Sequence, residues 1–155
     1  MEVDRNGLEV LEREECLRLL DTVVVGRVAF TSQALPCVLP VNFRRDGDRI
    51  LFRTGKGTKL ATATRNTVVG FEFDDFDPDT HTGWSVLVVG MAHRLRDRDA
   101  AATSSLDLPR WAPHGDGHVV AVSTEIVSGR RIQPEESSSN SADGHSGAVR
   151  QDLRP

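Results

Sequence analysis

The stretch "VLPVNFRRDGDRILFRTGKGTKLA", residues 38–61, decides the fold. Two runs rich in Val, Ile, Leu and Phe flank Asp46-Gly47, a strong signal for a two-residue hairpin turn, so the two strands should pair antiparallel. Pro40 lies inside the first run, and proline has no N–H to donate to a strand ladder. One edge of this strand should therefore face water, a second subunit or a ligand. A planar heterocycle that accepts main-chain hydrogen bonds from Val41 and Asn42 would suit such an edge.

Strand-like segments dominate the rest of the chain. Six segments are rich in Val, Ile and Phe, and several alternate apolar with polar residues, as half-buried strands do. They span residues 23–32, 36–45, 48–54, 67–75, 83–96 and 118–132. Helical character is confined to residues 8–23, 58–65 and 97–106, whereas a doubly wound parallel sheet needs a helix after nearly every strand. The pattern predicts a mainly β protein, a six-stranded antiparallel barrel that is closed or nearly closed.

Length and composition limit the class of protein. A chain of 155 residues that is 38% hydrophobic and 27% charged is typical of one soluble globular domain. No apolar stretch approaches the ~20 residues that cross a bilayer, and the acidic start is unlike a secretory signal, so we expect no membrane contact and a cytoplasmic location. The net charge of -4 and the lack of a long basic run argue against nucleic-acid binding.

Domain organisation and cysteine content are simple. Residues 134–155 contain no aromatic residue and few aliphatic ones, so they cannot bury enough surface to offset the entropy of ordering. We expect a folded domain at residues 1–133 and a disordered polar tail at residues 134–155. The two cysteines, Cys16 and Cys37, are too few for a disulfide framework and should be reduced.

The turn that joins the third strand to a helix, residues 52–65, is rich in cations and hydroxyls. Two glycines allow positive φ angles and the close approach of a ligand. With the unpaired N–H groups of the helix start, the polar side chains would bind an anion such as a phosphate. These side chains are Arg53, Lys56, Lys59, Thr54 and Thr58. A flexible, solvated connection explains the composition too, and the spacing does not match the Walker pattern.

Two metal-like patterns fail on closer reading. Asp75, Asp77 and Asp79 alternate as in a calcium loop, but the sixth and twelfth positions lack the required Gly and Glu. His114 and His118 are four residues apart, but intervening glycines argue against the helix that would direct both at one zinc ion. We therefore expect no metal site, and no Ser/His/Asp arrangement suggests nucleophilic catalysis.

Three motifs in order resemble the flavin-binding split-barrel family, whose best-known member is pyridoxamine 5'-phosphate oxidase. They are "VLPVNF", "ILFRTGKGTKLA" and "GWSVLVVGMAHRL", and the match covers roughly residues 8–130. The chain is most similar to the small, actinobacterial-type members of that family. The resemblance implies a split barrel and a homodimer in which each of two FMN molecules lies in the groove between subunits.

The resemblance also implies roles for individual residues. The strand would run along the isoalloxazine edge with Val38, Leu39, Pro40, Val41 and Asn42. The phosphate would be held by Arg53, Thr54, Thr58 and Lys59, and the second subunit would contribute Trp84 and Ser85. For Trp84, plain core or interface packing is the alternative.

The function implied is a flavin-dependent oxidoreductase that acts on an unknown small molecule, in which the cofactor carries the chemistry. The chain lacks the arginine-rich C-terminal segment with which pyridoxamine phosphate oxidase proper binds its substrate, so vitamin B6 chemistry is not expected. Two alternatives stay open: a reductase that uses the deazaflavin coenzyme, and a non-catalytic flavin-binding protein.

Overall fold

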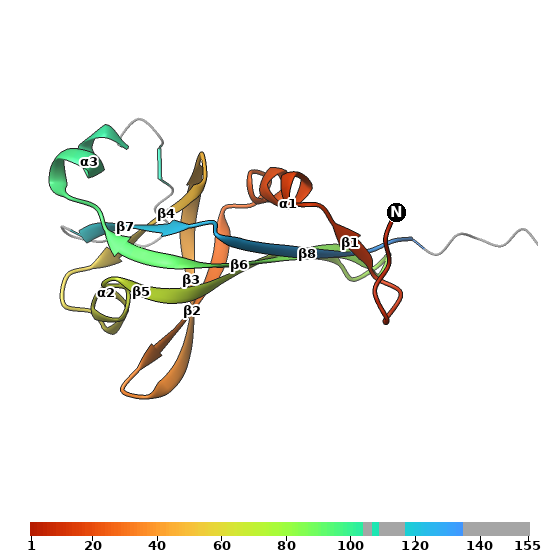
Figure 1. The fold of residues 1–155 in the computed structure, drawn as a ribbon, viewed down its shortest axis with the longest axis horizontal. Helices are drawn as coiled ribbons and strands as arrows, with labels where there is room; N and C mark the ends of the chain where they lie inside the picture. Colours follow the sequence, from red (N-terminus) through yellow and green to blue (C-terminus); the bar gives the residue numbers. More distant parts are fainter. Residues whose placement is uncertain (104–106, 109–116, 135–155) are drawn as a thin grey trace, which may run out of the picture.

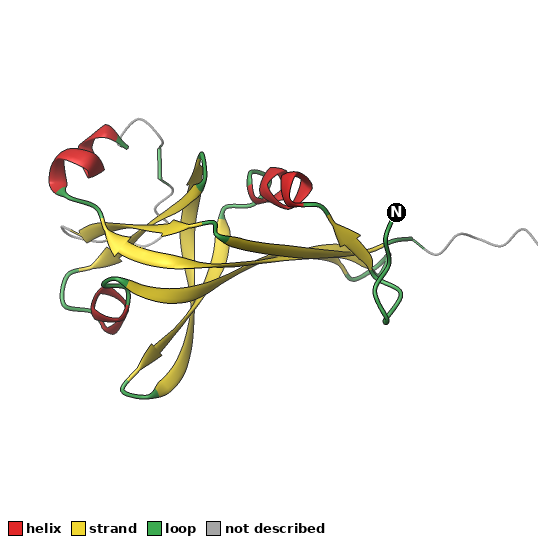
Figure 2. Ribbon diagram, viewed as in Figure 1, coloured by secondary structure: helices red, strands yellow, loops and turns green. Residues whose placement is uncertain are grey.

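The computed structural model describes residues 1–103, 107–108 and 117–134 (Figure 1). Within these residues it contains eight strands and three short helices (Figure 2). In chain order they are β1 (Glu9–Leu11), α1 (Arg13–Leu20), β2 (Val25–Ser32), β3 (Leu35–Asp46), β4 (Arg49–Gly55), α2 (Lys59–Ala63), β5 (Thr67–Asp77), β6 (Thr82–Arg94), α3 (Asp97–Ala102), β7 (Gly117–Ser123) and β8 (Ile126–Ile132).

Six of the strands close into a barrel. The sheet runs β1-β8-β6-β5-β2-β3-β4-β7, and an additional pairing of β6 with β7 joins its two parts into a ring. Every pairing is antiparallel. β6 pairs with β8 along its first half and with β7 near its end, so β8 and β1 extend the sheet beyond the barrel. The predicted six-stranded antiparallel barrel is confirmed.

Two boundaries differ from the sequence prediction. The expected single strand at residues 118–132 is two strands, because Thr124 turns aside and its amide and hydroxyl both donate to the carbonyl of Asp48, at 3.0 and 2.9 Å. Residues 9–11 form the short strand β1 instead of helix, and α1 begins only at Arg13. The end of the third expected helix, His114 and the tail from residue 135 lie outside the described residues.

Aromatic packing fills the barrel. Phe43, Phe52, Phe71 and Phe73 are all at most 1% exposed, and the rings of Phe71 and Phe73 stack with centroids 4.7 Å apart. Gly26 of β2 lies against these rings, since an added Cβ would stand 2.5 Å from a carbon of Phe71. The inner faces of the strands thus meet in the main core cluster, and a second, smaller cluster is formed by Leu51, Leu95, Leu108, Val119 and Ala121.

Two tight hairpins shape the region of interest. In the β3–β4 hairpin Asp46 pairs with Arg49, and Gly47 adopts the positive φ of 60° that such a turn requires. In the β2–β3 hairpin the turn consists of Gln33 and Ala34, which have φ angles of 52° and 62° although neither is glycine or asparagine. The second turn carried no sequence signal of its type.

Among the described residues, no helix is long and apolar enough to cross a membrane.

Candidate functional site

Among the strands that the structure describes, none covers one edge of β3 along part of its length. It pairs with β2 over residues 35–42 but with β4 only from Phe43 to Asp46. The amide of Phe43 donates to the carbonyl of Val24 at 3.2 Å, and main-chain directions alternate along a strand. Odd-numbered residues of β3 therefore turn their amides toward β2, and even-numbered residues turn theirs toward the uncovered edge. Pro36 and Pro40 are both even-numbered, so neither interrupts the β2–β3 ladder.

This register changes the expectation for the main-chain donors. Val41 faces Gly26 in a hydrogen-bonded position, so its amide points into the sheet and not toward the uncovered edge. Asn42 is the residue of the predicted pair whose main chain turns to that edge, while its side-chain amide donates to the carbonyl of Val24 at 3.3 Å. Val38 and Leu39 of the same strand are 60% and 43% exposed.

The strands β3 and β4 diverge at the pair Phe43–Phe52. Immediately beyond this pair, Asn42 lies on one arm of the fork and Arg53 on the other. After the fork β4 pairs only with β7. The structure therefore brings the predicted ring-binding strand and the predicted phosphate loop to the two sides of one gap, and α2, which contacts β2 and β4, stands beside it.

The loop between β4 and α2 is ordered by threonine hydroxyls. The hydroxyls of Thr54 and Thr58 lie 2.9 Å apart, and Thr58 also donates to the carbonyl of Gly55 at 3.0 Å. The same Thr58 oxygen caps α2 by accepting from the amide of Ala61 at 3.1 Å. Because α2 has only five residues and its first turn is already capped, the helix adds little to anion binding.

Positive charge gathers around this loop. Lys56 and Lys59 are the only two lysines of the whole chain. His118 of β7 is the cross-strand partner of Thr54, and its pKa is lowered by partial burial and by the charges of Arg94, Lys56 and Arg65. The guanidinium Nε of Arg53 is buried in the same region. The field at this end of the barrel favours an anion.

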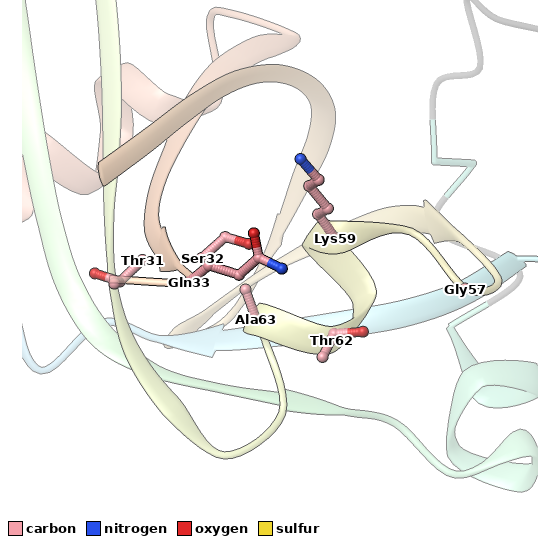
Figure 3. Close-up of a pocket in the computed structure, with 7 residues that line it drawn as sticks. All are labelled: Thr31, Ser32, Gln33, Gly57, Lys59, Thr62 and Ala63. Atoms are coloured by element: carbon pink, nitrogen blue, oxygen red, sulfur yellow. The ribbon is translucent and has the colours of Figure 1, made fainter. Parts of the chain in front are cut away.

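A cavity of about 320 Å³ lies between the loop with α2 and the β2–β3 hairpin (Figure 3). Its walls are Thr31, Ser32 and Gln33 on the hairpin side and Gly57, Lys59, Thr62 and Ala63 on the other. The side chains of Gln33 and Lys59 come from opposite walls (Figure 3). Lys59 thus belongs both to the predicted phosphate loop and to the cavity.

Trp84 and Ser85 do not join this group within one protomer. They begin β6, and the loop lies near the other end of that strand, where β6 meets β7 (Figure 1). Ten residues of strand separate Trp84 from Arg94, which is about 33 Å. Trp84 is 9% exposed and belongs to the core cluster, whereas Ser85 lies on the outer face of the sheet.

Sequence reasoning missed the hairpin wall of the cavity. The predicted strand at residues 23–32 ends with Thr31 and Ser32, as β2 does, but no signal marked the turn that follows, because Gln33 and Ala34 include no Gly, Asn or Asp. No group of three or more His, Cys, Asp or Glu side chains within the described part of the chain could hold a metal ion.

Comparison with known proteins places the chain in a family. Residues 12–137 match the family model described as pyridoxamine 5'-phosphate oxidase. An uncharacterised protein of Mycobacterium tuberculosis, Rv0080, is 41% identical over 127 residues, which are 79% of this chain and 84% of that protein.

Comparison with solved structures also finds similar proteins. The FAD binding protein from Mycobacterium smegmatis has a TM-score of 0.69 and 36% identity, over 80% of this chain and 97% of that one. A conserved protein of unknown function from Corynebacterium diphtheriae, DIP1874, has a TM-score of 0.69 and 31% identity, over 81% and 98% of the two chains. With the barrel, the fork and the basic loop all in place, the chain belongs to the pyridoxamine 5'-phosphate oxidase family and has its flavin-binding split-barrel fold.

Proposed function

We propose that this protein binds a flavin nucleotide in the gap between the uncovered edge of β3 and the β4–α2 loop, and uses it to oxidise or reduce a small molecule. The observation that carries the proposal is the fork beyond Phe43–Phe52. It sets a strand edge suited to a planar ring opposite a loop that holds both lysines of the chain. The Mycobacterium smegmatis neighbour, described as an FAD binding protein, supports a flavin as the ligand.

The chain's residues would hold the FMN unit at two ends. Lys59 and Arg53 would bind the phosphate, with the hydroxyls of Thr54 and Thr58 as further partners. Hydrogen bonds to a charged group contribute about 1.5–3 kcal/mol each before ordering costs. The residues Val38–Asn42 would orient the ring, with the main chain of Asn42 on the side that faces it. When bound, the flavin supplies two-electron transfer, and the protein supplies position and electrostatics.

We propose a homodimer, because the outer face of the sheet is apolar across five strands. The lateral partners Ile126, Val89, Gly70, Ala29 and Val38 form one row on β8, β6, β5, β2 and β3. Ile126 and Val38 are 63% and 60% exposed, and Leu87 in the next row is 44% exposed. A face of this kind, rimmed by charged side chains, is typical of a surface buried by a partner.

The charged side chains on the same face are paired within one protomer, which also favours burial against a second copy. Arg27 bonds Glu72 at 3.0 Å and Asp74 at 2.6 Å, so most of the charge beside the apolar row is already neutralised within the protomer. Burying that network against a twofold copy would cost less than burying single charges. The partner's outer face would also present Ser85, which begins β6 in its own protomer.

Both cysteines are free thiols, which fits the cytoplasm we propose as the location.

The visible absorption spectrum of the purified protein tests the proposal most directly. We expect flavin bands in the protein as isolated, or a rise in melting temperature when FMN or FAD is added to colourless protein. Colourless protein whose melting temperature responds to neither nucleotide would overturn it. Bleaching of the flavin bands under a reduced nicotinamide donor, followed by recovery in air, would support turnover over a purely structural role.

A further inference from the structure

We propose that the basic end of the barrel, formed by Lys56, Arg65, Arg94 and His118, docks a small acidic protein that carries electrons one at a time and reduces the flavin. This inference rests on the proposed function, since it assumes a flavin beside the β4–α2 loop. Each docked carrier would lose one electron, so two encounters supply the two electrons, and the solvent supplies the two protons, that reduce one flavin. A low-potential iron–sulfur protein belongs to this class of donor.

The basic end lies where the inner face of the barrel passes beyond its core. Ala92 of β6 and its cross-strand partner Val122 of β7 both belong to the core cluster, and cross-strand partners share a face. Arg94 lies two residues further along β6, so its side chain leaves the sheet on the same face but past Ala92. His118 lies two residues beyond the core residue Val120 in the same direction. Both side chains therefore stand at one end of the barrel.

Lys56 and Arg65 complete the basic end from the side of α2. Lys56 lies in the β4–α2 loop and Arg65 just after α2, and both are exposed. Burial first, and then the charges of Arg94, Lys56 and Arg65, lower the pKa of His118. The three cations are thus close enough together to act on one imidazole.

The charge at this end is opposite to that of the rest of the chain. Residues 53–65 carry four cationic side chains and no carboxylate, whereas the whole chain has a net charge of -4, so the other residues together carry -8. In Figure 1, α2 and β7 lie on one side of the view and the N-terminus on the other. A separation of charge of this kind turns an acidic surface toward the loop and repels it from the remainder of the protein.

Arginines of the basic end are less well paired than arginines elsewhere. Arg27 donates to Asp74 at 2.6 Å, so its charge is neutralised within the protomer. Arg94 approaches its carboxylate, Asp97, only to 3.7 Å, and the Asp97 side chain is 99% exposed. Arg65 forms no ion pair with another residue that the structure describes. Positive charge at this end is therefore available to carboxylates of another molecule.

A protein suits this surface better than a small anion does. Lys56, Arg65 and Arg94 are exposed, come from three separate segments, and do not line the cavity beside α2. Small anions are held by convergent groups in a concave site, whereas exposed charges speed the encounter of two proteins. Contacts between electron-transfer proteins bury little surface and are weak. A nucleic acid would also meet the acidic remainder of the chain.

The basic end adjoins the proposed flavin site. Lys56 lies between Thr54 and Thr58 in the loop that would hold the phosphate. His118 is the cross-strand partner of Thr54. A carrier docked on Lys56 and His118 would therefore stand beside the bound flavin, as electron transfer over a short distance requires.

The test uses a plant-type ferredoxin, an acidic one-electron carrier, as the probe for the full-length protein. Isothermal titration calorimetry measures binding of the oxidised probe, which needs no flavin chemistry. Stopped-flow absorbance without oxygen measures reduction of the flavin by the reduced probe. Because salt screens exposed charges, we expect affinity and rate each to fall about tenfold between about 0.02 and 0.3 M NaCl.

Charge reversal locates the docking surface. At low salt, Arg65→Glu should weaken probe binding and slow flavin reduction by about threefold, and Arg65→Glu with Arg94→Glu by about tenfold. Arg65→Lys keeps the charge and should retain both. Arg5→Glu is the matched control, because it changes the net charge equally on the exposed N-terminal segment, and it should alter neither. Photochemical reduction with deazariboflavin and EDTA should be the same in all variants, which shows that their flavin is bound and reducible.

The outcomes separate the two proposals. Protein that holds no flavin but binds the probe in this salt-dependent way would overturn the flavin proposal and the reduction step, but not the docking surface. If flavin is bound and photoreducible, yet Arg65→Glu and Arg5→Glu affect the probe equally, the flavin proposal stands and the docking proposal is wrong. If duplex DNA or NADPH binds more tightly than the probe and loses affinity with Arg65→Glu, the basic end serves that ligand and not an acidic protein.

Discussion

Gly90 and Ser123 touch at the point where the barrel closes: a Cβ atom on Gly90 would stand 1.8 Å from the main-chain oxygen of Ser123. At this residue β6 exchanges its partner β8 for β7, with Val89 opposite Ile126 and Ala92 opposite Val122. The two strands can approach this closely only because position 90 has no side chain.

We therefore expect Gly90→Ala to destabilise the protein by about 3 kcal/mol, because the clash is with main chain and can be relieved only by moving a strand. Urea unfolding followed by circular dichroism measures the change. Gly70→Ala is the control, since a Cβ there would meet Ala29 at an ordinary 3.6 Å. Its effect should stay within about 0.5 kcal/mol. Equal effects of the two substitutions would mean that the β6–β7 contact does not limit stability.

Much of the barrel was predictable because β2, β5 and β6 alternate buried residues with more exposed ones. In β6 the buried residues Trp84, Val86 and Val88 take every second position, and the period of two marks a half-buried strand. The break at Thr124 was not predictable in this way. It depends on a long-range bond to the carbonyl of Asp48, which leaves no local trace in a run that reads as continuous strand.

The candidate site was predictable only in part. Pro40 indicated a strand edge that no neighbour covers, and the structure shows that edge along residues 35–42. The direction of the Val41 amide was not accessible, because it follows from the pairing register and a one-residue shift would reverse it. The cavity wall at Gln33 was missed for a related reason: its turn is imposed by pairing of the flanking strands against local preference.

Chemical labelling should locate the phosphate. Because Lys56 and Lys59 are the only lysines, an amine-reactive acetylating reagent reports almost solely on the loop, with the amino group of Met1 as an internal control. We expect saturating FMN or FAD to slow acetylation of Lys59 at least fivefold and that of Met1 by less than twofold, as read by peptide mass spectrometry. Unchanged labelling of Lys59 with flavin bound would place the phosphate elsewhere.

The titration of His118 should report an anion at the same loop. Burial first, then Arg94, Lys56 and Arg65, lowers the pKa of this imidazole, and Asp97 acts in the opposite direction. A bound flavin phosphate would offset those cations and raise the pKa, which proton NMR measures directly.

His118 also makes the stability of the fold depend on pH. With a lowered folded-state pKa, the unfolded chain binds the proton more readily, so His118 lowers stability as pH falls through about 6.5. Bound flavin should lessen that loss. Arg94→Gln should raise the pKa of His118 without any ligand. If neither bound flavin nor Arg94→Gln moves the pKa of His118, the positive electrostatic field proposed at the β4–α2 loop is contradicted.

Acid should release α1 from the sheet. Hydrogen bonds from Arg18, at 2.7 Å, and from Arg131 of β8 lower the pKa of Glu15 to about 2. Because the folded-state value is depressed, the contribution of Glu15 is complete above about pH 4.5 and is lost as pH falls toward 2. Glu15→Gln should cost about 1 kcal/mol at pH 7, allowing for solvent screening, and almost nothing at pH 2.5. Glu14→Gln, on the exposed side of α1, should leave stability unchanged at both pH values. Equal costs for the two substitutions would show that Glu15 does not help to dock the helix.

The outer sheet face should decide the oligomeric state. Ile126 lies at one end of the apolar row and is 63% exposed, so Ile126→Asp would place an unpaired carboxylate in a twofold interface, at a cost of several kcal/mol. We expect wild-type protein to be a dimer at micromolar concentration and the variant to be a monomer, as measured by light scattering coupled to size exclusion. Val3→Asp, which changes a 55% exposed valine at the sheet edge beside Glu9 of β1, should remain dimeric. If Ser85 completes the flavin site across the twofold axis, the monomeric variant should also bind flavin at least tenfold more weakly, although its own β4–α2 loop is intact. A monomer that retains full flavin affinity would show that one protomer holds the whole site.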